Sequence, residues 1–280
     1  MRNIIKKIDK LPPFPAVYHK AMQLLRNPET SVDELIQVIQ YDQAITANVL
    51  RMCNSAYYGL QRKINSLRDG LVVLGNNQLK EIVSGSSMVN FYQRKSEGYD
   101  LERGELWKSA ISSALISQIV CKLIGRPKNP TLFTAALLHD VGKMVLNDFV
   151  WEENKKIVQL VQEGGYSFEE AELNVLGMDH AEVGAIIAEQ WGFPEDIIRA
   201  IRLHHSPEEV PEDDIITPIV YLSDVVTLIM GIGVGSDGLS YRGKEEAMKR
   251  FGLKERDLER VMVDFYEAYN NVQNILSMDE

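Results

Sequence analysis

Helix start signals recur along almost the whole chain and leave little room for a sheet. Ser31 with Glu34, and Ser167 with Glu170, have the spacing of a capping box, in which the two side chains satisfy the first turn of a helix. Asn129 precedes a proline, as expected for an N-cap followed by the first helical residue. Apolar residues recur at helical spacing, whereas period-two alternation is nearly absent. The sequence therefore predicts an all-α fold.

The polar stretch from Ser96 to Gly104 is a candidate hinge between two helical lobes. It separates an N-terminal lobe, residues 1–95, from a second lobe, residues 96–230. Four glycines in residues 231–238 predict a loop, which lacks the Lys-Ser/Thr ending of a phosphate-binding P-loop. The remaining helices, within residues 231–280, carry an apolar stripe that fits either packing against the body or a dimer surface.

Composition narrows the class of protein. The net charge of -10 argues against a general nucleic-acid binder, because phosphate contacts require clustered Lys and Arg. The first ten residues do not read as a signal peptide, and no apolar run is long enough to span a bilayer. Cys53 and Cys121 form neither a disulfide framework nor a metal-spaced pair. These features predict a cytoplasmic protein without a membrane partner.

An apolar run, residues 135–138, leads into the pair His139-Asp140. Neighbours on a helix diverge by about 100°, so an ion between them can be reached by both side chains. Imidazole nitrogen with carboxylate oxygen suits a transition metal. Gly142 is expected to let the backbone leave the helix, and Lys143 to place a mobile cation where a phosphate ligand would bind. Taken alone, the pair describes a capped helix end as readily as a metal site.

Further metal-ligand residues follow downstream, each at a predicted helix end or inside an apolar helix. His180 begins a helix, His204 and His205 end another, and Asp224 interrupts an apolar one, where an unpaired carboxylate would be costly. The six candidate ligands are His139, Asp140, His180, His204, His205 and Asp224. We expect them to converge and to hold Fe, Mn, Ni or Zn. The alternative is a hydrogen-bonded polar core in which the two aspartates orient the histidines.

Several short sequence motifs resemble those of known families. His139-Asp140 resembles the signature of the HD superfamily of metal-dependent phosphohydrolases. Four further short motifs lie in the N-terminal half, at Leu11–Val17, Tyr41–Thr46, Asn54–Gly59 and Gly70–Gly75. With these motifs, the chain from about Leu11 to His205 resembles more closely the HDOD family, whose members are mostly regulatory. One departure is Gln43, where the family usually has a proline, and it is expected to change only a helix start.

The resemblance implies an HD-like bundle with a degenerate site. HD-type sequences place a first histidine ligand just after a Trp-basic pair, and here Trp107-Lys108 is followed by Ser109. The retained ligand set resembles the HD-GYP cyclic-dinucleotide phosphodiesterases. The residues after His205, numbered 206–210, nevertheless lack the Gly-Tyr-Pro word of that branch.

Two functions follow from these features. The favoured one is a bacterial-type regulator of signal transduction that senses a ligand or docks a partner without efficient turnover. Its partner would be a signalling protein or a small nucleotide that binds near Lys143, and the chain could form a homodimer. The alternative is a metal-dependent phosphohydrolase acting on a nucleotide or cyclic dinucleotide, in which a metal-bound water attacks phosphorus. With Ser109 in place of a ligand, one metal position would be left to water or an anion.

Overall fold

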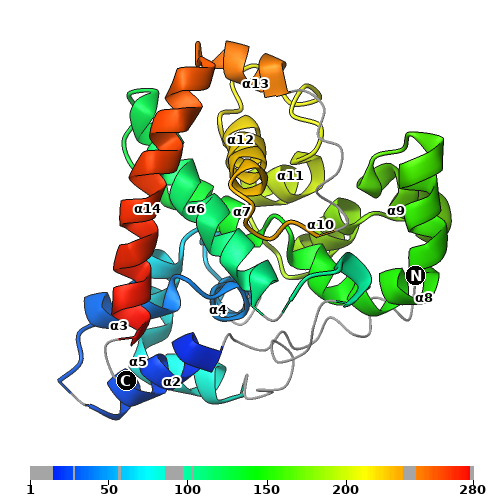
Figure 1. Ribbon diagram of the computed structural model, residues 1–280. Helices are drawn as coiled ribbons and strands as arrows, with labels where there is room; N and C mark the ends of the chain where they lie inside the picture. The colour runs from blue at the N-terminus through cyan, green and yellow to red at the C-terminus, as the bar shows by residue number, and fades with distance from the viewer. Residues whose placement is uncertain are drawn as a thin grey trace.

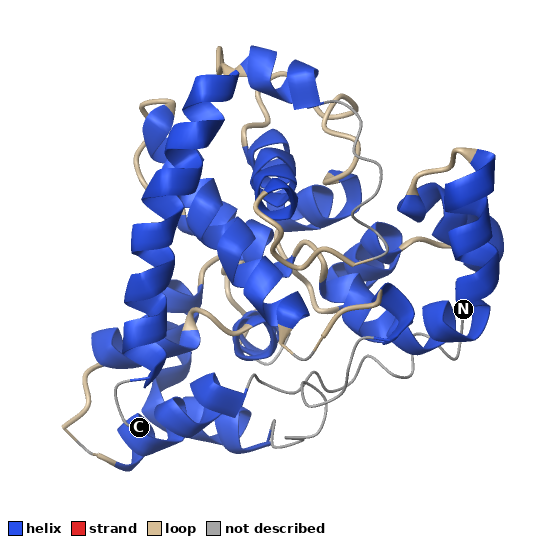
Figure 2. Cartoon of the chain, in the orientation of Figure 1, coloured by secondary structure: helices blue, strands red, loops and turns tan. Residues whose placement is uncertain are grey.

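The computed structural model describes residues 15–27, 29–55, 58–85, 97–102, 104–235 and 244–277. Within these ranges the fold is all-helical and contains no strand (Figure 2). The predicted fold class is therefore confirmed. The boundary expected at residues 95–96, the hinge residue Arg103, most of the proline-rich opening word and part of the Asn54–Gly59 word lie outside the described residues.

The described helices are arranged as shown in Figure 1. In chain order, the first group is α2 (Pro15–Arg26), α3 (Val32–Ile39), α4 (Gln43–Cys53), α5 (Leu67–Gly85) and the 3-10 turn η1 (Glu97–Tyr99). The second group is α6 (Glu105–Leu123), α7 (Pro130–Leu138), α8 (Val141–Gly164), α9 (Phe168–Leu176), α10 (His180–Gln190), α11 (Glu195–Leu203) and α12 (Ile216–Ile229). The chain continues with α13 (Lys244–Arg250) and α14 (Glu255–Ser277).

The predicted capping signals at helix starts act where the sequence places them. Ser31 and Ser167 both form complete capping boxes, and the Asn129 side chain accepts hydrogen bonds from the first turn of α7. Gly75 breaks α5 with a φ of 71°, a conformation that glycine adopts without steric cost. The kink divides this segment into two helices.

Helix α6 lies at the centre of the second half of the molecule. It packs against α7 and α12, and α14 crosses its outer side (Figure 1). Small side chains allow this close approach: the buried residues of α6 include Ser109, Ala110, Ser112, Ser113, Ala114 and Ser117. Helix α14 buries Leu258, Val261, Phe265 and Val272 and also reaches α2 and α3. The C-terminal helices therefore pack against the body.

The junction of α7 and α8 differs from the expectation in one respect. The helix ends at Leu138, and α8 begins at Val141, so Gly142 lies inside the first turn of α8 and the backbone does not leave the helix there. An added Cβ at Gly142 would lie 1.9 Å from the carbonyl oxygen of His180. The glycine therefore permits contact between α8 and α10, and does not end a helix.

Gln43 has a larger role than the expected change of a helix start. Its side chain is fully buried, and Nε2 donates to the carbonyl oxygen of Leu137 at 2.6 Å. This bond joins the first residue of α4 to the end of α7, two residues before His139.

Among the described helices, none has the length and hydropathy of a membrane span.

Candidate metal centre

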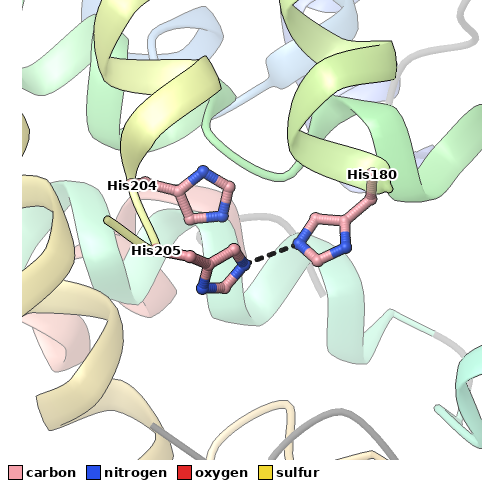
Figure 3. Close-up of side chains that lie close together, drawn as sticks. All are labelled: His180, His204 and His205. Atoms are coloured by element: carbon pink, nitrogen blue, oxygen red, sulfur yellow. Dashed lines mark hydrogen bonds between the residues drawn. The ribbon is translucent and has the colours of Figure 1, made fainter. Parts of the chain in front are cut away.

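Four parts of the fold bring the six predicted ligands together. His139 and Asp140 form the turn between α7 and α8, His180 begins α10, and His204 and His205 follow α11. Asp224 reaches the same place from α12. Figure 3 shows the rings of His180, His204 and His205 gathered at one point. The predicted convergence is observed; that the residues hold a metal stays a prediction.

The rings of His139 and His204 are each held by a hydrogen bond from Nδ1 to a backbone carbonyl oxygen. In His139 and His204 this nitrogen lies 2.7 Å from the carbonyl oxygens of Ala136 and Ile201. A carbonyl oxygen only accepts, so both Nδ1 atoms donate, and in a neutral ring the opposite nitrogen, Nε2, has a free lone pair. An outer acceptor on Nδ1 with Nε2 directed inward is the usual arrangement of a metal-binding histidine.

The inward atoms surround the carboxylate of Asp140. Its Oδ1 lies 3.5 Å from Nε2 of His180 and 3.6 Å from Nε2 of His204. Nε2 of His139 lies 3.4 Å from Oδ2 of Asp140 and 3.3 Å from Oδ1 of Asp224. Ligands about 2.0–2.2 Å from one ion are separated by about 2.8–3.6 Å at right or tetrahedral angles. The observed spacing therefore fits a shared cation.

Three atoms of this cluster are close to charged neighbours but lack a hydrogen bond. Nε2 of His139, Oδ1 of Asp140 and Nε2 of His204 are buried and make no hydrogen bond with the described residues. Buried polar atoms in folded proteins nearly always have a partner. Two triplets have the mutual closeness that a metal ion requires: His139, Asp140 and His204, and His180, His204 and His205.

Burial and neighbouring charge set the protonation of the cluster. Burial opposes the charged form of Asp140, but the Lys143 ammonium and the His139 ring outweigh it and hold the pKa of this carboxyl well below its usual range. Burial also lowers the pKa of His204, which stays below the ordinary value. For His139, burial lowers the pKa, but the charges of Asp140 and Asp224 raise it by more than burial lowers it. The pKa of His139 is therefore above its ordinary value.

The pKa values of His180 and His205 are shifted in opposite directions. Burial lowers the pKa of His180, but the carboxylate of Glu172 raises it, to about 9 overall. Burial, together with the charge of His204, holds the pKa of His205 well below its usual value. Nε2 of His180 and Nε2 of His205 lie 2.8 Å apart (Figure 3). The raised pKa of His180 and the lowered pKa of His205 favour the His180 ring as the donor. A metal ion bound by both rings would replace this proton.

Glu172 and Tyr99 belong to the site although the sequence reasoning missed them. Glu172 is fully buried on α9, and its two oxygens accept from the Tyr99 hydroxyl and the His180 ring, each at 2.6 Å. One signal was present. Glu172 lies four residues after Phe168 and three before Val175, on the apolar face of its helix.

Lys143 is not the mobile cation expected from the sequence. Its side chain is buried, and Nζ donates to Oδ2 of Asp140 at 2.7 Å. Nζ also lies 5.8 Å from the ring centroid of Tyr99. The lysine therefore neutralises the cluster from within, and a phosphate would have to draw it away from Asp140.

Ser109, at the position of the missing first ligand, faces a loop. A Cβ added to Gly233, just after α12, would lie 2.6 Å from Cβ of Ser109. The Gly233 amide donates to Glu105 one turn earlier on α6, at 3.2 Å. An imidazole at position 109 would therefore have to displace this loop or turn away from it.

The fold and the site together define an all-α protein with a buried cluster of histidines and aspartates. The model of one family, the HDOD domain, matches residues 11–207, and the chain belongs to this family. The resemblance to the HDOD family that the sequence motifs indicated is thereby confirmed.

Solved structures show the same fold. An HDOD domain protein of unknown function from Geobacter sulfurreducens is 26% identical with a TM-score of 0.54, and the match covers 99% of this chain and 96% of that one. The MmoQ response regulator from Methylococcus capsulatus is 23% identical with a TM-score of 0.68, over 90% of this chain and 98% of that one. A virulence factor from Campylobacter jejuni has a TM-score of 0.68 at 20% identity, over 93% and 96%.

Among curated proteins, an uncharacterized protein from Treponema pallidum is 24% identical over 212 residues. The match covers 75% of this chain but 40% of that relative, so the chain spans less than half the relative's length.

Proposed function

We propose that the chain is a regulatory protein of the HDOD type whose buried cluster holds a divalent transition-metal ion. It senses a ligand or docks a partner and does not turn over phosphoesters efficiently. The observation that supports the metal is the set of three unpartnered, buried and mutually close atoms of His139, Asp140 and His204. A cation is a partner that all three can share, because it takes neutral imidazole and ionised carboxylate together.

The chemistry of the ligand atoms limits which metal ions the cluster would bind. Imidazole nitrogen with carboxylate oxygen favours Fe, Mn, Ni or Zn over Mg or Ca. Such an ion would supply Lewis acidity when bound. The residues of the chain hold it in place: Glu172 behind His180, and backbone carbonyl oxygens behind His139 and His204.

Two features of the site support regulation over turnover. Ser109 offers a neutral hydroxyl where HD-type enzymes have a histidine, and the loop at Gly233 takes the adjacent space. Lys143 is committed to Asp140 and is not placed to meet a substrate phosphate. Hydrolysis by a metal-activated water requires an open coordination position and groups that stabilise the charge on phosphorus.

A metal-dependent phosphohydrolase is the second candidate. The observations in its favour are that all six candidate ligands converge, and that His205 keeps some solvent exposure whereas His139, His180 and His204 are buried. The chemistry of the donor set is compatible with either function, and the two differ in turnover.

Metal content and turnover separate these possibilities. The protein is purified without a His-tag or chelator, and its metal is measured beside that of an Asp140→Ala variant and a Glu163→Gln control on the exposed side of α8. We expect metal in the wild type and control and little in the variant. Nucleotides and cyclic dinucleotides are then screened with added Mn or Fe. We expect turnover well below about 1 per second, the low end of ordinary enzyme rates. Turnover at that rate would favour the enzyme.

A further inference from the structure

A large groove lies apart from the histidine cluster. Its volume is about 1170 Å³, and none of the six predicted metal ligands lines it. Its walls come from α3, the starts of α4 and α5, the C-terminal half of α6 and the first turns of α7, while α14 forms the outer side. Ligand sites commonly occupy about 300–1,000 Å³, so the groove has room for a small molecule of nucleotide size.

Three cationic side chains gather at one end of the groove. Lys122 is the last but one residue of α6, and Arg126 and Lys128 lie in the loop that leads to α7. None of the three forms an ion pair with a described carboxylate, whereas Arg68 across the groove is paired with Asp33 at 2.5 Å. In a chain of net charge -10, three uncompensated cations in one groove form a local site for an anion.

The adjoining wall offers aromatic and aliphatic side chains. Tyr41 and Phe133 meet edge to face, with ring centroids 6.4 Å apart, and Leu115 and Ile119 continue the wall along α6. The Tyr41 backbone is held in place because its carbonyl oxygen accepts from Nε1 of Trp107 at 2.8 Å. A planar ring of a ligand can pack against such a surface.

Polar groups complete the lining. Thr46 is 2% exposed and lines the groove, and its hydroxyl makes no hydrogen bond with the described residues. Asp264 and Glu267 line the side formed by α14. Carboxylates accept hydrogen bonds from hydroxyl groups such as those of a sugar. A buried hydroxyl without a partner indicates that something else satisfies it.

We propose that this groove binds a nucleotide, with its phosphates on Lys122, Arg126 and Lys128 and its base against Tyr41 and Phe133. The sugar hydroxyls then face the carboxylates of α14. An inorganic anion would use only the cationic end, and an uncharged ring compound only the apolar wall. A nucleotide is the class of ligand that uses both.

The groove and the histidine cluster share helix α7. Phe133 lines the groove, and the same helix ends one residue before His139. Gln43 on α4 donates a hydrogen bond to the Leu137 carbonyl oxygen on α7. Thr46, one turn after Gln43 on α4, lines the groove. A ligand in the groove therefore contacts the two helices that position the start of the cluster.

The test uses the full chain and a fluorescent mant-labelled ATP, followed by anisotropy in a metal-free buffer. Unlabelled ATP, adenosine and pyrophosphate serve as competitors. The double variant Arg126→Ala/Lys128→Ala is compared with Lys155→Ala/Arg256→Ala, two exposed cations outside the groove. We expect saturable binding that weakens at least about tenfold in the groove variant, as charge-assisted bonds to phosphate are lost, and that is unchanged in the control.

Further arms separate the groove from the histidine cluster and the nucleotide from its parts. Phe133→Leu should weaken ATP and leave pyrophosphate unaffected, and Asp140→Ala should retain ATP binding. Loss of binding in Asp140→Ala with retention in the groove variant would overturn the proposal and place the nucleotide at the cluster. Pyrophosphate competing as well as ATP, or no saturable binding by about 1 mM, the weak end of specific affinity, would overturn it as well.

Discussion

Glu172 holds His180 through two bonds to one carboxylate oxygen. Oε2 lies 2.6 Å from Nδ1 of the His180 ring and accepts from the His180 backbone amide at 3.0 Å. The same contact therefore anchors the start of α10 and fixes the direction of the ring. The remaining oxygen accepts from Tyr99, so the carboxylate links η1, α9 and α10 behind the cluster.

Replacing this carboxylate should destabilise the protein. We expect Glu172→Gln to lower the free energy of unfolding by about 1–3 kcal/mol, because buried groups lose charged hydrogen-bond partners. Urea unfolding of the wild type and the variant measures the change. Glu163→Gln on the exposed side of α8 is the matched control and should be near neutral. An unchanged midpoint for Glu172→Gln would show that the buried pair contributes no net stability.

The same pair predicts a pH dependence in chelator-treated protein. The pKa of His180 is raised by Glu172 from 6.5 to about 9. Because the folded pKa is above the unfolded one, the stabilisation is fully present below pH 6.5 and is lost as pH rises through about 9. Stability curves between these pH values should therefore fall less steeply in Glu172→Gln than in the wild type. Parallel curves would contradict this assignment.

The fold was predictable because its signals are local. A capping box such as Ser31 with Glu34 acts within four residues, so it can be read without knowing what surrounds the helix. His139 and Asp140 were also readable, because two ligand types stand side by side. The outer partners depend on tertiary contacts: Glu172 meets Tyr99 across 73 positions of sequence. A pattern of apolar spacing cannot show which distant group will lie opposite a buried acid.

Contact between α8 and α10 should tolerate no side chain at position 142. The Cβ of Gly142→Ala would meet backbone, 1.9 Å from the His180 carbonyl oxygen. We expect a loss of at least about 1–3 kcal/mol, the range of overpacking in a core, and a lower melting temperature. The Cβ of Gly164→Ala, at the other end of α8, would meet side-chain atoms of Tyr166 and Leu160 and not backbone, and the substitution should cost less. Equal melting temperatures would contradict the close packing described here.

Metal removal should lower thermal stability if the cluster holds an ion. A ligand that binds only the folded state at about 100 times its dissociation constant adds about 2.7 kcal/mol. Prolonged chelation should therefore lower the melting temperature, and added Mn, Fe or Zn should restore it. His204→Ala should be insensitive to both treatments. A wild type that contains no metal and is unchanged by added metal would leave the hydrogen-bonded polar core as the correct description.

Restoring a histidine at position 109 should not restore an enzyme. The loop at Gly233 lies on Ser109, so the imidazole of Ser109→His has to displace it, at a cost of about 1–3 kcal/mol for overpacking. Ser109→Ala removes one oxygen from the same place and serves as the control, with a smaller expected change. The measurements are urea unfolding and turnover of phosphodiester substrates with added Mn or Fe. Turnover gained together with undiminished stability would show that the loop yields readily and that Ser109 alone silences the site.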